Sequence, residues 1–214
     1  MKLSLVVPCF NEEGNVERFF NEVNNVFLCK VDDYEFVFIN DGSKDNTYKK
    51  LKEIYENNSA YNIQVLSFSR NFGKESAISA GLAAVSGECA VVIDCDLQHP
   101  PEKIIEMYRL WEQGYEIVEG IKNERGNEKK MHGIGAKLFY SVISRMAGFD
   151  MANSSDFKLL DRKVVDVLNK MPERGFFRAI SFWVGYKKAT VEYDVAKRVE
   201  GESKWSTKGL CMRD

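Results

Sequence analysis

Short apolar runs alternate along the chain with longer segments in which apolar residues recur every three or four positions. Apolar runs of this kind predict buried strands, and the recurring spacing predicts amphipathic helices. The strands are expected near 3–7, 35–39, 63–68, 89–93 and 115–119, and the helices near 12–28, 45–56, 75–85 and 101–112. Strands joined through helices form a mostly parallel sheet with helices on both faces, so the sequence predicts an α/β fold.

The first predicted helix has an apolar face made by Val16, Phe19, Phe20, Val23 and Phe27. Asn11 is expected to cap its start, and Glu12 and Glu13 are favourably placed at the positive end of the helix dipole. Gly87 and Gly114 follow later helices and are expected to end them, because glycine readily adopts the left-handed conformation found at helix ends.

Beyond residue 120 the alternation is less regular, and a polar stretch over 122–130 predicts a loop. The remaining elements are a helix at 133–147, a strand at 157–160, helices at 161–170 and 173–183, and a final strand at 188–194. The helix at 133–147 has two interpretations. It is either a core helix, which is favoured, or a helix at a membrane interface, because both are amphipathic.

A chain of 214 residues, 44% of them hydrophobic, is sufficient for one domain with its own core. The net charge of -2, with acidic and basic residues mixed, argues against nonspecific nucleic-acid binding. Five cysteines without a Cys-x-x-Cys spacing indicate reduced thiols and a cytosolic compartment. No secretion signal or bilayer-spanning segment is apparent, so membrane contact is expected to be peripheral or to come from sequence outside these residues.

Two carboxylates one residue apart, Asp94 and Asp96, follow the fourth predicted strand. Because side chains two apart in an extended strand point the same way, both are expected to face one divalent cation, with the Gln98 amide oxygen in reach. Oxygen ligands suit Mg²⁺ or Mn²⁺, and such a cation completes its shell with water and the phosphate oxygens of a diphosphate. Asp-x-Asp pairs are also common in surface turns. This pair, however, ends a buried strand and precedes Pro100 and Pro101, which favour a helix start.

The ends of the first two predicted strands bring further polar groups to the same edge of the sheet. Asn11 and Glu12 follow the first strand, and Asp41 follows the second. A carboxylate such as Asp41 can accept a hydrogen bond from a nucleotide base or a ribose hydroxyl. Its Asp-Gly-Ser context is equally a turn signal, and Asp45 is expected to be a helix cap only.

The loop after the third predicted strand carries two cations, Arg70 and Lys74, beside a helix start. Such a loop suits an anionic ligand. Solvated cations at helix edges are ordinary, so it is the neighbouring loops that favour a functional interpretation.

Six segments occur in the same order as in the family 2 glycosyltransferases of the GT-A fold, namely 7–12, 40–43, 70–74, 94–101, 155–162 and 198–206. The chain resembles in particular the polyprenyl-phosphate glycosyltransferases, which include dolichyl-phosphate mannose synthases and undecaprenyl-phosphate glucosyltransferases. The resemblance spans almost the whole chain. It implies one GT-A catalytic domain over 1–214, with a nucleotide-sugar-binding half at 1–120 and an acceptor-binding half at 121–214, without the membrane helices of many relatives.

The resemblance also implies roles for individual residues. The nucleotide sugar is expected to contact Pro8, Asn11, Glu12, Asp41, Arg70, Lys74, Asp94 and Asp96. Mg²⁺ or Mn²⁺ is expected on Asp94, Asp96 and Gln98, the acceptor phosphate on Arg125 and Arg198, and catalytic roles on Asp156, Arg198 and Lys204. The family pattern usually has arginine where this chain has Lys158, which puts a bidentate contact there in doubt.

Displacing a nucleoside diphosphate from the anomeric carbon builds negative charge on the leaving oxygen, which a divalent cation and basic side chains stabilise. The acceptor implied by the resemblance is a lipid phosphate, which is largely ionised near neutral pH and needs little help in losing a proton. Asp156 lies where a general base would lie in such enzymes. We therefore expect it to orient or modulate the acceptor rather than deprotonate it, in a single displacement with inversion.

The favoured activity is transfer of a hexose to a polyprenyl phosphate at the cytoplasmic face of the cell membrane. UDP-glucose is the expected donor, because 201–206 looks more like the bacterial uridine-diphosphate enzymes. The expected partners are the nucleotide sugar, the lipid and the membrane surface, with no nucleic acid and a homo-oligomer left open. The alternatives are a binding module without catalysis, a transferase acting on a glycan, and a phosphatase. A nicotinamide dehydrogenase is excluded because Gly-x-Gly-x-x-Gly is missing after the first strand.

Overall fold

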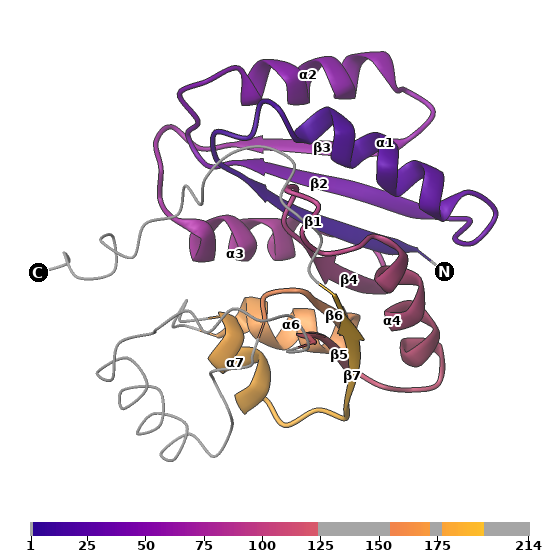
Figure 1. Cartoon of the computed structure of the whole chain (residues 1–214). Helices are drawn as coiled ribbons and strands as arrows, with labels where there is room; N and C mark the ends of the chain where they lie inside the picture. The colour runs from indigo at the N-terminus through magenta and orange to yellow at the C-terminus, as the bar shows by residue number, and fades with distance from the viewer. Residues whose placement is uncertain (1, 124–154, 172–176, 195–214) are drawn as a thin grey trace, which may run out of the picture.

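The computed structural model describes residues 2–123, 155–171 and 177–194. Within them, seven strands form one sheet in the order β3-β2-β1-β4-β6-β5-β7 (Figure 1). The strands are β1 (Leu3–Cys9), β2 (Tyr34–Asn40), β3 (Asn62–Ser67), β4 (Cys89–Val92), β5 (Ile117–Lys122), β6 (Lys158–Asp161) and β7 (Lys188–Tyr193). The helices are α1 (Val16–Phe27), α2 (Thr47–Asn57), α3 (Lys74–Ala84), α4 (Glu102–Glu112), α6 (Arg162–Lys170) and α7 (Phe177–Trp183).

The sheet is mostly parallel, as the sequence predicts. Strand β1 pairs in parallel with β2 and with β4, β2 pairs in parallel with β3, and β5 pairs in parallel with β7. Strand β6 is the exception, because it runs antiparallel to both β4 and β5. It therefore joins the parallel strands of the first half of the chain to the strands of the second half.

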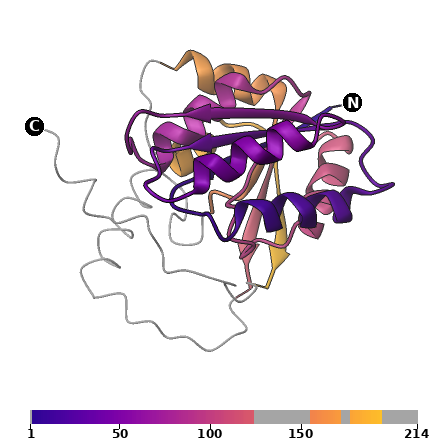
Figure 2. The ribbon, with the colours of Figure 1, turned by 90° about the horizontal axis from the view of Figure 1, so that it is seen from above.

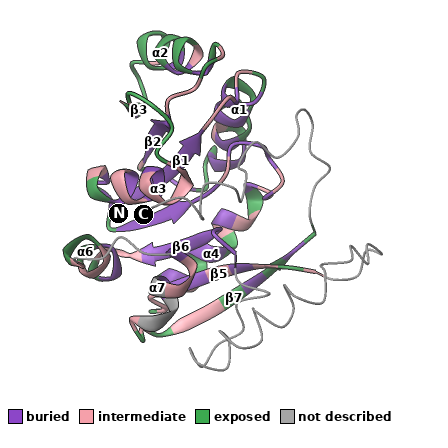
Figure 3. Ribbon diagram, turned by 90° about the vertical axis from the view of Figure 1, so that its left-hand side faces the viewer, coloured by how far each residue is buried: buried purple, intermediate pink, exposed green. Residues whose placement is uncertain are grey.

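Helices cover both faces of the sheet (Figure 2). The core residues on one face come from α1, α2 and α4, including Phe19, Leu51 and Ile104, and those on the other face from α3, α6 and α7, including Ile78 and Val164. Burial of a large apolar side chain stabilises the fold by about 1.5–3 kcal/mol. Strands β1, β2 and β4 are buried almost throughout, as expected for the middle of a sheet that is covered on both faces (Figure 3).

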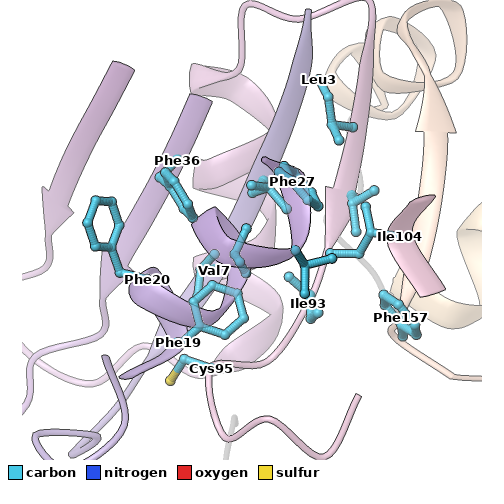
Figure 4. Packing of buried hydrophobic residues seen from close by; sticks show 14 of the residues in the cluster. Leu3, Val7, Phe19, Phe20, Phe27, Phe36, Ile93, Cys95, Ile104 and Phe157 are labelled. Atoms are coloured by element: carbon cyan, nitrogen blue, oxygen red, sulfur yellow. The ribbon is translucent and has the colours of Figure 1, made fainter. Parts of the chain in front are cut away.

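An aromatic group forms much of the core beneath α1 (Figure 4). The rings of Phe36 and Phe38 on β2 are stacked 5.5 Å apart, and Phe19 on α1 meets Phe38 edge to face with 6.4 Å between the ring centroids. The edge-to-face arrangement is favourable between aromatic rings beyond the area that they bury. The predicted apolar face of the first helix is thus confirmed as a core face.

The start of the first helix differs from the prediction. Helix α1 begins at Val16 and not near residue 12, so the expectation that Asn11 caps it is wrong. Asn11 has a φ of 54° and lies in the loop before the helix. Its backbone N–H donates to Ser43 Oγ, and its side-chain oxygen accepts from the backbone N–H of Lys44. Asn11 therefore ties together the loops that follow β1 and β2.

The two glycines that were expected to end helices behave differently. Gly114 directly follows the cap residue of α4 and has a φ of 88°, which confirms it as a helix stop. Helix α3 already ends at Ala84, so the prediction for Gly87 is wrong. A Cβ atom at Gly87 would lie 2.5 Å from the carbonyl oxygen of Lys2, so close backbone approach requires glycine there.

The second half of the chain confirms several predicted elements where it is described. Strand β6, helix α6 and strand β7 lie within about one residue of the predicted 157–160, 161–170 and 188–194. The polar stretch at 122–130 and the helix at 133–147 lie almost wholly outside the described residues. Among the described residues, no helix is both long and apolar enough to span a bilayer.

Candidate active site

The carboxyl ends of β1, β2 and β4 meet at one edge of the sheet, because β1 lies between its two parallel neighbours. The loops that leave these ends carry Asn11, Asp41 and Asp94. In open α/β sheets, the crevice at such a point is where ligands bind. The fold therefore brings together polar residues that are far apart in the sequence.

Asp41 is buried and holds the loop that contains Arg70 and Lys74. Its Oδ1 accepts from the backbone N–H of Phe72 at 2.7 Å, and its Oδ2 accepts from that of Gly73 at 3.0 Å. Burial raises the pKa of Asp41, although these hydrogen bonds oppose the shift. Contact of Asp41 with a base or a ribose stays a prediction. Its contact with the loop is a structural role that the sequence did not indicate.

The loops after β1 and β2 are joined by a network of polar contacts. Glu12 is buried, its Oε2 accepts from Asn15 Nδ2 at 2.6 Å, and its N–H donates to Thr47 Oγ1 at 2.7 Å. The N-cap residue of α2 is Asn46, so the prediction that Asp45 is the helix cap is wrong by one residue. Asp45 instead accepts from the backbone N–H groups of Thr47 and Glu13, which joins the two loops.

Four charged residues form a continuous chain across the site. The ammonium of Lys74 lies 2.7 Å from Oδ1 and 2.8 Å from Oδ2 of Asp94, and 2.9 Å from Oδ2 of Asp156. The guanidinium of Arg178, on α7, donates from Nε to Asp156 Oδ1 at 2.7 Å and from Nη2 to Asp156 Oδ2 at 2.9 Å. We call Asp94, Lys74, Asp156 and Arg178 the charge chain. It links the end of β4 to the second half of the molecule.

The ion pairs of the charge chain favour the charged forms of Asp156 and Lys74. Burial by itself would raise the pKa of Asp156, but Lys74 and Arg178 outweigh it and hold that pKa well below its usual value. Burial would likewise lower the pKa of Lys74, but Asp94 and Asp156 raise it above its usual value. Asp156 is therefore a poor proton acceptor near neutral pH, and its orienting role toward an acceptor stays a prediction.

Asp94 and Asp96 do not lie in an extended strand, so the geometric reason given for their common direction is wrong. Strand β4 ends at Val92, and the chain turns through Leu97, which has a φ of 58°. The side chain of Asp94 is 28% exposed, whereas Asp96 is buried and its Oδ1 accepts from the backbone N–H of Gln98 at 3.1 Å. A turn, rather than the pleat of a strand, sets how these carboxylates are presented.

The residues of this turn fit a divalent cation by their chemistry. Carboxylate and amide oxygens are the donors that Mg²⁺ and Mn²⁺ prefer. A positive charge, the ammonium of Lys74, already contacts both oxygens of Asp94. In the described part of the chain, no three or more His, Cys, Asp or Glu side chains gather as a metal cluster. The predicted metal ligands, Asp94, Asp96 and Gln98, are not a cluster of this kind, because only two of them are carboxylates and the third is an amide.

His99, which follows this turn, is buried between aromatic rings. Its ring lies 5.0 Å from that of Phe157 and 5.4 Å from that of Tyr193. Burial lowers its pKa. Its Nδ1 has no hydrogen-bond partner among the described residues. The histidine thus packs the turn against β7.

Two residues of the site were missed by sequence reasoning, Arg178 and Glu75. Arg178 completes the charge chain, and Glu75 Oε2 accepts from the backbone N–H of Phe177 at 2.8 Å. Nothing in the sequence distinguished Glu75 from the other residues of a predicted helix. Arg178 likewise looked like an ordinary charged residue of another predicted helix. Only the packing of α7 against α3 brings them together.

Lys158, where the family usually has arginine, is almost fully buried. Its ammonium donates to Ser181 Oγ at 2.9 Å and lies 3.3 Å from Glu119 Oε1. Burial lowers its pKa, although Glu119 opposes the shift. Lys158 therefore joins β6 to β5 and to α7, next to Asp156.

The other predicted site residues are more scattered. Pro8 is buried within β1, and the exposed Arg70 lies with its guanidinium 4.4 Å from the ring centroid of Phe72. Arg125, Arg198 and Lys204 lie outside the described residues.

A mostly parallel sheet with a charged site at the carboxyl ends of its strands is typical of ligand-binding α/β proteins, and comparison with known proteins identifies the family. The family model "Glycosyl transferase family 2" matches residues 4–168, and the chain belongs to this family. It is a glycosyltransferase, so the phosphatase interpretation is wrong. An uncharacterized glycosyltransferase of Synechocystis sp. is 41% identical over 208 residues, which cover 96% of this chain and 65% of the relative.

A prophage bactoprenol glucosyl transferase homolog of Escherichia coli is 38% identical over 208 residues, or 96% of this chain and 67% of the relative. The chain thus spans about two thirds of the length of the curated relatives that it matches.

Solved structures confirm the GT-A fold. A glucosyl-3-phosphoglycerate synthase from Mycobacterium tuberculosis, in complex with Mn²⁺, uridine diphosphate and glucosyl-3-phosphoglycerate, matches with a TM-score of 0.63 at 21% identity. The match covers 94% of this chain and 73% of that one. A mannosyltransferase from Pyrobaculum calidifontis, in complex with GDP-Man and Mn²⁺, has a TM-score of 0.64 at 17% identity, covering 95% of this chain and 58% of that one.

Proposed function

We propose that this chain is the catalytic part of an enzyme that transfers a hexose from a nucleotide-diphosphate sugar to a polyprenyl phosphate, with inversion, at the cytoplasmic face of the membrane. UDP-glucose is the proposed donor. The observation that carries the proposal is the charge chain, which runs from the turn of Asp94 and Asp96 to Asp156. The bactoprenol glucosyl transferase relatives support the acceptor class and the sugar.

Asp94, Asp96 and Gln98 would hold Mg²⁺ or Mn²⁺. The cation, when bound, stabilises the negative charge that develops on the departing diphosphate. Mn²⁺ in the two solved structures of the same fold supports this assignment. Lys74 lies beside Asp94 and would contribute a further positive charge to this end of the donor site.

The remaining donor contacts are proposed from the three loops at the sheet edge. Pro8, Asn11, Glu12 and Asp41 would line the nucleoside end. Arg70 would meet the phosphates, and its loop is held in place by Asp41 through two backbone hydrogen bonds. Because this scaffold is fixed by buried contacts, the donor would meet preorganised groups, which lowers the cost of ordering them on binding.

Asp156 would orient the attacking phosphate rather than take a proton from it. Its carboxylate is held on two sides by Lys74 and Arg178. A phosphate monoester has a second pKa of about 6, so at neutral pH it is largely a nucleophilic dianion. Arg125, Arg198 and Lys204 are proposed as further phosphate contacts in the acceptor half.

The test measures nucleotide release from a panel of sugar nucleotides, with Mn²⁺ or without, and with or without a short polyprenyl phosphate. UDP-glucose should give release that requires both the metal and the lipid. Asp94→Asn should lower kcat by about 100-fold or more, since the cation that stabilises the departing diphosphate would lose one of its two carboxylate ligands.

The matched control is Asp166→Asn, whose carboxylate lies on α6, 51% exposed and 3.8 Å from Arg162. This variant should keep wild-type kcat. Metal-dependent release without any need for the lipid would contradict the acceptor assignment, and transfer to a glycan instead would replace it. A glycosyl-enzyme intermediate trapped on any carboxylate would contradict inversion by single displacement.

A further inference from the structure

The metal-binding carboxylate that we propose already carries a cation, the ammonium of Lys74. This ammonium lies 2.7 Å and 2.8 Å from the two oxygens of Asp94, and its remaining contact in the charge chain is Asp156 Oδ2 at 2.9 Å. An ammonium has three N–H donors, so these three contacts use all of them. A divalent cation on Asp94 would therefore lie next to the ammonium and repel it.

The backbone that carries Lys74 is fixed. Lys74 is the first residue of α3, and the two residues before it donate their backbone N–H groups to the buried Asp41. The side chain, in contrast, has rotatable bonds of its own, and it is 18% exposed. Repulsion by an incoming cation is thus relieved by rotation of the Lys74 side chain and not by movement of the loop.

A second carboxylate is in place to keep the displaced ammonium. Asp156 Oδ2 already contacts Lys74, and the Asp156 side chain is only 9% exposed. Arg178 contacts both oxygens of Asp156 and fixes the carboxylate from the other side. The ammonium can therefore leave Asp94 without leaving the site.

We propose that Lys74 is the resident cation of the metal site, which neutralises Asp94 in the absence of metal and moves wholly to Asp156 when a divalent cation binds. This inference rests on the proposed function, since it takes Asp94 as a metal ligand. Lys74 is then a positioning residue. When the divalent cation binds at Asp94, the Lys74 ammonium moves and changes the charge around Asp156. Metal binding on the donor side is thereby coupled to the place where the acceptor is expected.

The test compares binding of Mn²⁺ alone to the wild-type chain and to four variants, by electron paramagnetic resonance of the unbound ion. Lys74→Met removes the competing ammonium and should tighten Mn²⁺ binding about tenfold, a change typical of losing one close like charge. Lys74→Arg keeps a cation at this position and should bind Mn²⁺ as wild type does. A purely structural role for Lys74 predicts weaker or unchanged binding in Lys74→Met.

Arg178→Met is the matched control, because it removes one positive charge from Asp156 and none from Asp94. It should change Mn²⁺ affinity by less than about threefold, as expected for a charge further from the ion. Equal tightening in Arg178→Met and Lys74→Met would overturn the inference, since it would reflect overall charge rather than competition at Asp94.

Asp94→Asn separates failure of the inference from failure of the proposed function. If Asp94→Asn binds Mn²⁺ as tightly as wild type, the proposed metal site is wrong and the inference falls with it. If Asp94→Asn loses binding while Lys74→Met is unchanged, only the inference is wrong. Should Lys74→Met not fold, a crystal structure of the wild-type chain with Mn²⁺ decides. In that structure, the inference requires Lys74 Nζ to have left both oxygens of Asp94. If Lys74 Nζ still contacts Asp94, the inference is overturned.

Discussion

At the scale of single residues, the site depends on carboxylates whose partners define their roles. Asp156 is nearly buried, and its negative charge is held between the cations of Lys74 and Arg178. Asp41 is also buried, but its partners are backbone N–H groups, so it holds a loop. The same side-chain chemistry thus serves two purposes, because the hydrogen-bond partners of the two carboxylates differ.

The first prediction concerns the stability that Asp156 contributes. Asp156→Asn leaves two partly buried cations around a neutral amide at a buried position and should lower the free energy of unfolding by about 3 kcal/mol at neutral pH. The surface control Asp166→Asn should lower it by less than about 0.5 kcal/mol. Urea unfolding of the two variants and the wild type measures both differences. Equal losses would show that the charge chain contributes no more than a surface ion pair.

The pH dependence of this stability has a defined sign. The pKa of Asp156 is lower in the folded state than the value of about 3.9 in an unfolded chain. Its contribution is therefore fully present above about pH 5 and is lost as the pH falls through the folded pKa. Unfolding measured from about pH 8 to about pH 3 should give a constant difference between wild type and Asp156→Asn that shrinks only below about pH 4. A difference that instead grows with acid would contradict the assignment of the shift.

At the scale of elements, the loops at the sheet edge are shaped by contacts between distant parts of the chain. Gly42 follows Asp41 and has a φ of 61°, and a Cβ atom there would lie 2.2 Å from the carbonyl carbon of Arg70. The loop after β2 therefore packs directly against the loop before α3. This contact, together with the hydrogen bonds of Asp41, sets the position of Lys74.

The second prediction compares two glycines with positive φ. Gly42→Ala should lower the free energy of unfolding by about 3 kcal/mol or more, because a backbone clash adds to the strain of a left-handed residue. Gly114 has a φ of 88°, and a Cβ atom there would meet no described atom within 4 Å, so Gly114→Ala should cost only the strain, about 1 kcal/mol. Gly42→Ala should also raise KM for the donor, whereas Gly114→Ala should leave it unchanged. Equal effects on stability and on KM would show that the two loops are not in contact.

At the scale of the whole molecule, β1 lies inside the sheet and β3 lies at one edge of it. All seven residues of β1 are buried, whereas only Ile63 is buried in β3. The antiparallel β6 lets the second half of the chain extend the same sheet rather than form a separate core. The charge chain crosses this junction, since Asp94 follows β4 and Arg178 lies on α7.

The third prediction follows from this arrangement. Amide hydrogen exchange should be slowest in β1 and β4, which have paired neighbours on both sides, and faster in the edge strand β3. Mass spectrometry of peptides after exchange measures the rates. Protection of β3 equal to that of β1 would contradict the edge position.

Much of this protein was determined by local sequence. Hydrophobic periodicity indicated the strands and helices of the described residues, because each strand or helix buries a face that its own residues define. Polar residues directly after buried strands indicated the edge at which the site lies. The six segments in order indicated the family and its GT-A fold, which the family model and the solved structures confirm.

Tertiary structure alone decided how those residues meet. Asn11 does not cap α1, because its side chain bonds to the backbone of Lys44 in another loop. Arg178 belongs to the site only because α7 packs beside Asp156. Lys74 lies on Asp94 because a buried carboxylate holds its loop. Contacts between segments far apart in the sequence carry no periodic signal, since they depend on where complete elements pack.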